Sequence, residues 1–254
     1  MITQKIKFIV AVTALIFAGQ LSAENDNSGV LGTLKLQNYV TQFNANDEEL
    51  YAHISNKDAY AFLEKNIPLF ECPDKDLERT YYFRWWTFRK HVRNTKDGYV
   101  ITEFLPKVNW SGKHNTINCP ASHQFREGRW LKDQTFVHDY MEFYLNTPGS
   151  LPHNFSFWSA DSALEVTKVQ PNDEWLKKIM PGLLKHYNVW GRWRTAPNEL
   201  YAQRDMKDGM EWTAGGRKLM GGDKFHFRVR SVRPSFNSYM YGDSVALAAI
   251  AEKM

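Results

Sequence analysis

The sequence predicts a mainly α-helical fold, and three observations lead to that prediction. Apolar residues recur at intervals of three and four along several long segments, which is the spacing of one helix face. Alternating patterns typical of strands are confined to two short stretches, residues 99–105 and 225–232. The connections between periodic segments are long and rich in aromatic and charged residues, which indicates functional loops rather than disorder. We therefore expect helices joined by long loops, with short β-hairpins inserted between them.

The first residues have the order of a secretory signal peptide. Two lysines within Met1–Lys7 precede the apolar run Phe8–Gly19, and Leu21-Ser22-Ala23 ends in small residues. The run is about 12 residues long, whereas a membrane span needs roughly 20. We expect residues 1–23 to be removed, the remaining chain to have no membrane segment, and the protein to be periplasmic or secreted.

Residues 24–68 are predicted to form a linker and a helical lead-in, with Asn46 or Asp47 capping a helix that runs to Leu63. The next helix is predicted over residues 76–91. Its apolar side chains fall on two faces, which predicts burial on both sides; one face carries Leu77, Tyr81, Trp85 and Phe88, and the other carries Tyr82 and Trp86.

The two short strands and four further helices are predicted in the rest of the larger region, residues 69–254. Asp97-Gly98 predicts a turn before the first strand, and Asp133 begins a helix with an apolar stripe over residues 136–144. A helix is predicted over 154–169. Residues 173–190 carry the longest apolar stripe, in which Pro181 predicts a kink or a break. The last predicted helix covers residues 235–251.

Charge and cysteine content exclude several classes of function. The net charge is +4, but Lys and Arg alternate with Asp and Glu, so no basic stripe for nucleic acid is present. The two cysteines, Cys72 and Cys119, could pair in an oxidising compartment. Because there is no CxxC motif and the histidines are scattered, we expect neither a metal site nor a cofactor.

Aromatic residues make up 15% of the chain, with nine tryptophans, and several of them adjoin charged residues. Rings beside Arg, Asp and Glu suit a ligand that has apolar faces and many hydroxyl groups. The sequence therefore indicates an oligosaccharide or polysaccharide ligand.

The stretch DGMEWTAGG, residues 208–216, suggests where chemistry takes place. Glycosidic bond cleavage uses one carboxylic acid and a second carboxylate across the sugar, and the acid must stay protonated near neutral pH. An apolar wall promotes this, and Glu211 lies between Met210 and Trp212. The catalytic candidates are therefore Glu211 and Asp208. The alternative is that one of these carboxylates only caps a loop or a helix.

Other residues are candidates for substrate binding. Arg129, Trp130 and Asp133 in EGRWLKD would stack on and hydrogen-bond a sugar, or else an Arg–Asp pair pins this loop. Trp158 and Asp161 are three apart on a predicted helix and share one face. Two further candidates, Trp212 and Asn237, come from the segments described next. Arg84 is expected to be a structural ion-pair member, and Tyr239 and Tyr241 are expected in the core.

Several motifs between residues 70 and 251 resemble the six-hairpin glycosidases, particularly the trehalase and processing α-glucosidase clan. Gly209–Thr213 (GMEWT) resembles the stretch that holds the catalytic acid, with Glu211 at the acid position, and Asn237-Ser238-Tyr239 resembles the helix start downstream of it. FWSAD resembles the clan's Trp–Asp element in the sugar pocket. ECPDKDLERTYYFRWW and EGRWLKD resemble a bacterial branch found in polysaccharide degradation.

The resemblance implies an (α/α)6 toroid of twelve helices in two rings, of which residues 69–254 would form about half of the helical hairpins. It also implies an inverting mechanism with a general base near the far end of the domain. None of the carboxylates after Glu211 has a context that matches this base: Asp223, Asp243 and Glu252. We therefore expect the base to be missing and the domain to be truncated. Trehalases have Asp at the position of Glu211, which leaves the linkage open.

The sequence thus predicts an exported, inverting glycoside hydrolase domain with Glu211 as general acid. One alternative is a saccharide-binding or decayed enzyme fragment without catalysis. Another is a structural fragment whose uncovered helix faces cause self-association.

Overall fold

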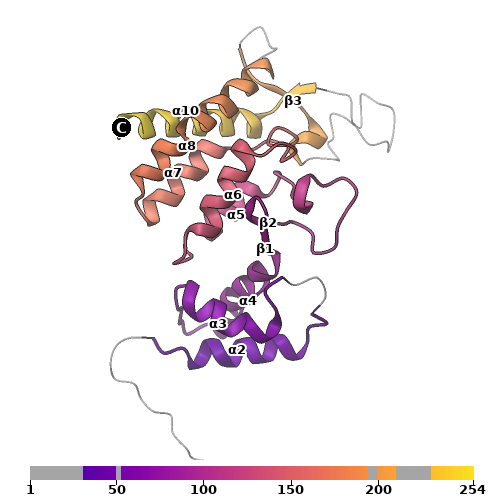
Figure 1. The fold of residues 1–254 in the computed structure, drawn as a ribbon, viewed down its shortest axis with the longest axis vertical. Coiled ribbons are helices and arrows are strands. Elements are labelled where there is room, and N and C mark those ends of the chain that lie inside the picture. Colours follow the sequence, from indigo (N-terminus) through magenta and orange to yellow (C-terminus); the bar gives the residue numbers. More distant parts are fainter. Residues whose placement is uncertain (1–30, 50–52, 194–198, 210–229) are drawn as a thin grey trace, which may run out of the picture. The chain divides into compact units, whose positions relative to one another are not determined.

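The computed structural model describes residues 31–49, 53–193, 199–209 and 230–254, and the predicted signal peptide lies outside them. In this part of the chain there are eight α-helices and two small antiparallel sheets (Figure 1), so the predicted mainly α fold is confirmed. Among the described helices, none has the length and apolar character that a membrane crossing needs.

Three helices form the first group: α2 (Leu34–Ala45), α3 (Asn56–Asn66) and α4 (Lys75–His91), each of which packs on the other two. The predicted cap at Asn46 or Asp47 is wrong, because α3 begins after Ser55, whose Oγ accepts a hydrogen bond from the N–H of Asp58. The carboxylate of Asp47 instead binds Lys90 of α4 at 2.5 Å.

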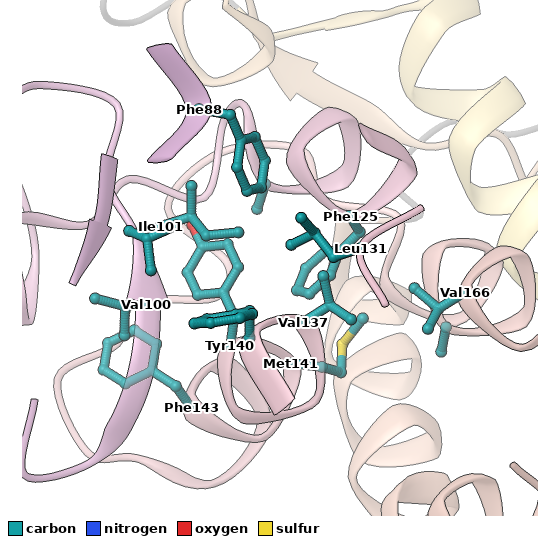
Figure 2. Packing of buried hydrophobic residues seen from close by; sticks show 14 of the residues in the cluster. Phe88, Val100, Ile101, Phe125, Leu131, Val137, Tyr140, Met141, Phe143 and Val166 are labelled. Carbon is teal, nitrogen blue, oxygen red and sulfur yellow. The ribbon is translucent and has the colours of Figure 1, made fainter. Parts of the chain in front are cut away.

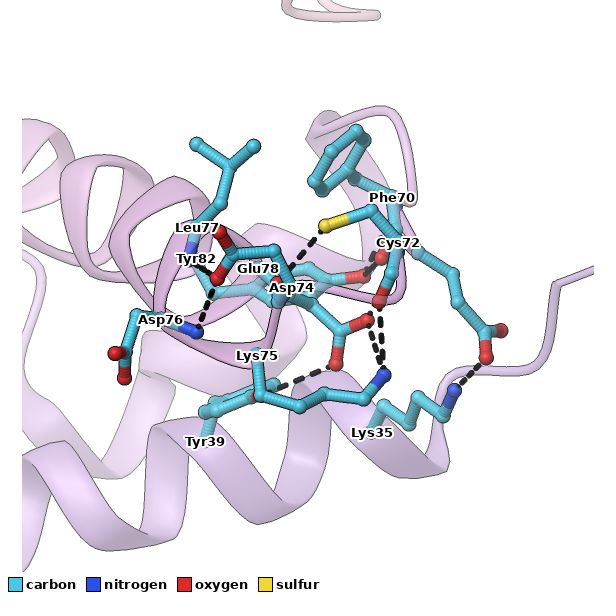
Figure 3. Close-up of polar contacts among 11 residues, drawn as sticks. Lys35, Tyr39, Phe70, Cys72, Asp74, Lys75, Asp76, Leu77, Glu78 and Tyr82 are labelled. Atoms are coloured by element: carbon cyan, nitrogen blue, oxygen red, sulfur yellow. Dashed lines mark hydrogen bonds and ion pairs between the residues drawn. The ribbon is translucent and has the colours of Figure 1, made fainter.

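A buried carboxylate joins these elements. Glu78 of α4 is almost fully buried and accepts hydrogen bonds from Tyr39 Oη of α2 at 3.0 Å and from the N–H of Cys72 at 3.1 Å (Figure 3). Lys75 supplies the compensating charge at 3.1 Å. Burial raises the pKa of Glu78, but these hydrogen bonds outweigh it and the pKa is lowered. The ionised carboxylate therefore connects α2, the segment before α4, and α4.

A hairpin follows α4. Strands β1 (Val92–Thr95) and β2 (Gly98–Ile101) pair antiparallel with Thr95 opposite Gly98, where the turn places Gly98 at φ +92°. The predicted strand 99–105 therefore ends earlier, at Ile101. Asp139 of α6 (Thr135–Asn146) accepts the N–H of Tyr99 at 3.0 Å, which attaches the hairpin to that helix.

The remaining helices surround α7 (Ser159–Val169). They are α5 (Ala121–Gly128), α6, α8 (Asp173–Trp190) and α10 (Pro234–Glu252). Sequence patterns did not predict α5, and α7 begins five residues later than expected. Short 3₁₀ turns occur at η1 (Lys113–Asn115), η2 (Gly191–Trp193) and η3 (Asp205–Asp208), and β3 (Ala202–Arg204) pairs with β4 (Arg230–Val232).

Helix α8 runs through Pro181 without a break, so of the two predicted outcomes the break is wrong and the kink stays a prediction. The residues on either side of the proline, Ile179 and Leu183, are both buried. A Cβ on Gly182 would lie 3.1 Å from Leu145 of α6, which shows how closely the two helices approach. Packing on both sides of Pro181 therefore outweighs the loss of one backbone hydrogen bond.

The hydrophobic core extends from Leu36 to Ile250 and so crosses the expected boundary at residue 68. Figure 2 shows its centre, where Tyr140 and Met141 of α6 meet Phe125 of α5 and Ile101 of β2. Helix α4 contributes Tyr82, Trp85, Trp86 and Phe88 as predicted, but Leu77 at its first turn is 53% exposed.

Candidate active site

A cavity of about 290 Å³ lies at the amino end of α7. Helices α5, α7 and α10 supply its walls, and the lining residues are His123, Arg126, Trp158, Asp161, Ser238, Tyr239 and Gly242. Trp158 and Asp161 both line it, so the residues predicted to share a helix face lie together here.

Aromatic rings form one wall of this cavity. Trp158 and Tyr239 stack with ring centroids 4.0 Å apart and 23° between their planes, and His123 meets Trp158 edge-on at 5.1 Å. The backbone N–H of Trp158 donates to Ser122 Oγ at 3.2 Å, which anchors the ring to α5. Such an apolar wall beside polar groups suits a sugar face.

Charged groups lie next to the rings. Arg126 Nη2 binds Asp161 Oδ2 at 2.5 Å, and Arg126 Nη1 lies 3.7 Å from Glu165 Oε2. Glu165 also binds Arg129 and Lys168. Burial raises the pKa of Glu165. The hydrogen bonds and charges of Lys168, Arg126 and Arg129 lower it by more, so the net shift of the pKa is downward.

A second cavity, of about 430 Å³, shares His123 with the first and includes Gln124 and Glu127 of α5. Glu127 accepts hydrogen bonds from Arg84 Nη2 at 2.9 and 3.1 Å. Arg84 is therefore an ion-pair member, but its side chain is 61% exposed rather than buried. Burial raises the pKa of Glu127, and Arg84 only partly offsets this. His91, also in this wall, has its pKa lowered by burial.

The predicted catalytic stretch is only partly described. Asp208 in η3 has a side chain 1% exposed, and its Oδ2 accepts hydrogen bonds from Arg233 Nε at 2.9 Å and from Ser235 Oγ. Burial raises the pKa of Tyr239, and the charge of Asp208 adds to this effect. Glu211 and Trp212 lie outside the described residues.

Three other candidates have contacts away from the first cavity. Arg129 pairs with Glu165 rather than with Asp133, and its guanidinium lies 5.3 Å from the ring of Trp130. Asp133 accepts the N–H of Thr135 at 3.0 Å at the start of α6. None of the three lines either of the two cavities, so their role in sugar binding stays a prediction.

The side-chain amide of Asn237 is used within the fold. Its Oδ1 accepts the N–H of Tyr201, and its Nδ2 donates to the carbonyl oxygens of Tyr201 and Arg233, at 2.8–2.9 Å. These bonds hold the start of α10 beside the segment before β3. Contact between Asn237 and a substrate also stays a prediction.

Sequence reasoning missed His123, Arg126 and Tyr239. Tyr239 and Tyr241 were both expected in the core. Tyr239 packs partly buried against a core cluster and also lines the cavity, whereas the expectation for Tyr241 is wrong, because it is 73% exposed. The NSY motif, residues 237–239, already pointed to Tyr239, because it resembles a helix start in the six-hairpin glycosidases and lies in the first turns of α10. No sequence pattern predicted the contact between His123 and Trp158, because α5, which carries His123, was not predicted.

A family model described as a mannosylglycerate hydrolase MGH1-like glycoside hydrolase domain matches residues 113–254, which is more than half of the chain. The chain belongs to this glycoside hydrolase family. The resemblance to six-hairpin glycoside hydrolases is thereby confirmed. The matched region contains α5, α7 and α10, and hence every residue that lines the first cavity.

A solved structure titled "Sialidase" has the same fold, with a TM-score of 0.80 and 34% sequence identity. The match covers 91% of this chain and 21% of that chain, so this chain spans about a fifth of the length of the solved protein. No curated protein matches the chain.

The first cavity combines stacked rings, a carboxylate and a guanidinium, which is an arrangement that fits a glycoside hydrolase domain.

Cys72 and Cys119 are both thiols. Within the described residues, no three His, Cys, Asp or Glu side chains are grouped as metal ligands.

Proposed function

We propose that this protein is an exported glycoside hydrolase that cleaves glycosidic bonds in oligosaccharides or polysaccharides at the cavity before α7. The observation that carries the proposal is the stacked pair Trp158–Tyr239 beside Asp161 in the lining of this cavity. Export rests on the signal-peptide pattern of residues 1–23.

The sugar would lie on the aromatic wall with its hydroxyl groups toward Asp161. A carboxylate and a guanidinium in one ion pair can accept from one hydroxyl group and donate to its neighbour. Burial of the ring faces adds apolar contact, so binding would depend on Trp158 and on the carboxylate of Asp161.

Glu211 is the proposed general acid. It would give its proton to the leaving oxygen of the glycosidic bond, while water attacks the anomeric carbon from the opposite face and loses its proton to a second carboxylate, the general base that we expect to be missing from this chain. This route inverts the anomeric configuration. The described segment ends at Gly209, where an added Cβ would lie 3.2 Å from Cys119 Sγ, just before α5. Through Arg233 and Ser235, Asp208 would hold this end of the catalytic loop beside the cavity.

The test uses the complete chain with mannosylglycerate, the glycoside in the family description, and a panel of oligosaccharides and p-nitrophenyl glycosides. Released sugar and its first-formed anomer are followed by NMR. Glu211→Gln should reduce turnover by about 10²–10⁴-fold with binding nearly unchanged.

The matched control is Glu174→Gln, which changes an exposed carboxylate on α8. Saccharide binding without turnover in the unsubstituted chain would favour a binding protein instead. Equal turnover in Glu211→Gln and the unsubstituted chain would refute the role of Glu211.

A further inference from the structure

The first turn of α7 is held by a buried carboxylate from a distant helix. Asp243 of α10 is 0% exposed, and its Oδ1 accepts the backbone N–H of Asp161 at 2.9 Å. Burial raises the pKa of Asp243, and the backbone N–H groups at the start of α7 oppose this. The residue that precedes α7, Trp158, makes no side-chain cap, so the N–H of Asp161 depends on Asp243 for its acceptor.

This N–H group belongs to a residue that lines the cavity. Asp161 presents its carboxylate to the cavity, and Trp158 stacks on Tyr239, four residues before Asp243 on α10. A shift of α7 relative to α10 would therefore separate the two rings and move the Asp161 carboxylate away from Arg126 at the same time.

We infer that Asp243 is a positioning residue, which fixes Asp161 and Trp158 in the geometry that binds the sugar. It does not itself line the cavity. The inference rests on the proposed function for the sugar, but the anchoring of α7 can be tested without any sugar.

The experiment measures amide hydrogen exchange of the complete chain for Asp243→Ala, Asp243→Asn and the control Ser244→Ala. Ser244 is the next residue on α10, and its hydroxyl bonds only within that helix, to the carbonyl oxygen of Tyr241. We expect Asp243→Ala to speed exchange of the Asp161 amide by at least about tenfold, because this donor loses its acceptor. Asp243→Asn keeps an acceptor oxygen and should stay within about threefold of the unsubstituted chain.

Unchanged exchange of the Asp161 amide in Asp243→Ala would overturn the inference, and so would equal effects of Asp243→Ala and Asp243→Asn. If Asp243→Ala does not fold, an NMR pH titration of the unsubstituted chain tests the inference instead. The amide proton shift of Asp161 should then follow the titration of the Asp243 carboxyl group, and an Asp161 amide signal that ignores this titration contradicts the anchoring.

Saccharide binding separates the two proposals. Asp243→Ala should weaken binding of the saccharide found in the panel and Asp243→Asn should restore it, a rescue that a loss of general stability would not produce. If no saccharide binds to the unsubstituted chain, the proposed function fails. The hydrogen-exchange result still tests the anchoring of α7, because it does not depend on a saccharide.

Discussion

Asp161 combines two tasks in one carboxylate. Its Oδ2 pairs with Arg126, and the side chain faces the cavity beside the ring of Trp158. Because Arg126 also lies 3.7 Å from Glu165, the guanidinium keeps a carboxylate partner when Asp161 is neutralised. A substitution of Asp161 therefore changes what the cavity offers a ligand more than it changes the packing.

We predict that Asp161→Asn weakens saccharide binding by about tenfold or more. A hydrogen bond to a charged group contributes about 1.5–3 kcal/mol, and each 1.4 kcal/mol is a factor of ten in affinity. Titration of tryptophan fluorescence with the saccharide measures the effect. Glu174→Gln serves as control, because its exposed pair with Lys177 contributes little. Equal affinity of Asp161→Asn and the unsubstituted chain for the saccharide would show that the Asp161 carboxylate does not contribute to binding.

At the scale of helices, α4, α5 and α6 approach one another closely at Gly128. An added Cβ at Gly128, the last residue of α5, would lie 2.6 Å from Val137 of α6 and 3.3 Å from Phe88 of α4. Val137 and Phe88 are themselves buried, so they have no space into which to move.

We predict that Gly128→Ala destabilises the protein by about 1–3 kcal/mol, which is the usual cost of overpacking. Gly191→Ala is the matched control: Gly191 has helical backbone angles and no atom within 4 Å of an added Cβ. The control should be stabilised by about 0.4–1 kcal/mol through the unfolded state. Urea unfolding of both variants measures this, and equal stability of the two would contradict the close approach.

The contact between α7 and α10 makes a prediction about pH. Burial raises the pKa of Asp243 to about 8, against the opposing effect of the backbone N–H groups of α7. Between the ordinary value of 3.8 and about 8, the folded protein therefore holds a proton that the unfolded chain releases. This contribution favours the folded state at low pH and is lost as the pH rises through that window.

Asp243→Asn has no such proton, so its stability relative to the unsubstituted chain should increase from pH 4 to pH 8. The slope approaches about 1.4 kcal/mol per pH unit. Urea unfolding at a series of pH values gives the difference. A relative stability that decreases over this range would mean that the carboxylate is ionised and stabilised by α7.

At the scale of the whole molecule, a buried histidine sets the response to acid. His186 of α8 is fully enclosed, and its Nδ1 lies 2.9 Å from Ser159 Oγ. Burial lowers its pKa to about 3, the charge of His153 adds to this, and the Pro152 carbonyl opposes it. The folded protein excludes a proton that the unfolded chain binds below pH 6.5. The corresponding stability is complete above pH 6.5 and is lost as the pH falls toward 3.

We predict that the unsubstituted chain loses stability from pH 6.5 to pH 4 by up to about 1.4 kcal/mol per pH unit more than His186→Asn does. The difference between the two unfolding curves isolates His186, because His153 and Asp243 are present in both proteins. Parallel curves over this range would show that His186 does not control the acid response.

Much of the helical content could be predicted because apolar spacing is a local property. The helices at residues 75–91, 173–190 and 234–252 were found with ends close to those observed. Helix α5 was missed because it is only eight residues long, and its buried residues include a serine and a glycine. The break at Pro181 was wrong because packing by α6 is not visible in the sequence around the proline.

The sequence by itself determined that the chain is mainly helical, that it is a glycosidase-like protein, and that Trp158 and Asp161 share one face, since three residues nearly complete a helical turn. Only the tertiary structure decided that His123, Arg126 and Tyr239 join them, and that Asp243 holds Asp161 from a position 82 residues away. The physical reason is that helix periodicity depends on neighbouring residues. The partners of a buried polar group depend on which helices pack together, and that packing is settled by the core as a whole.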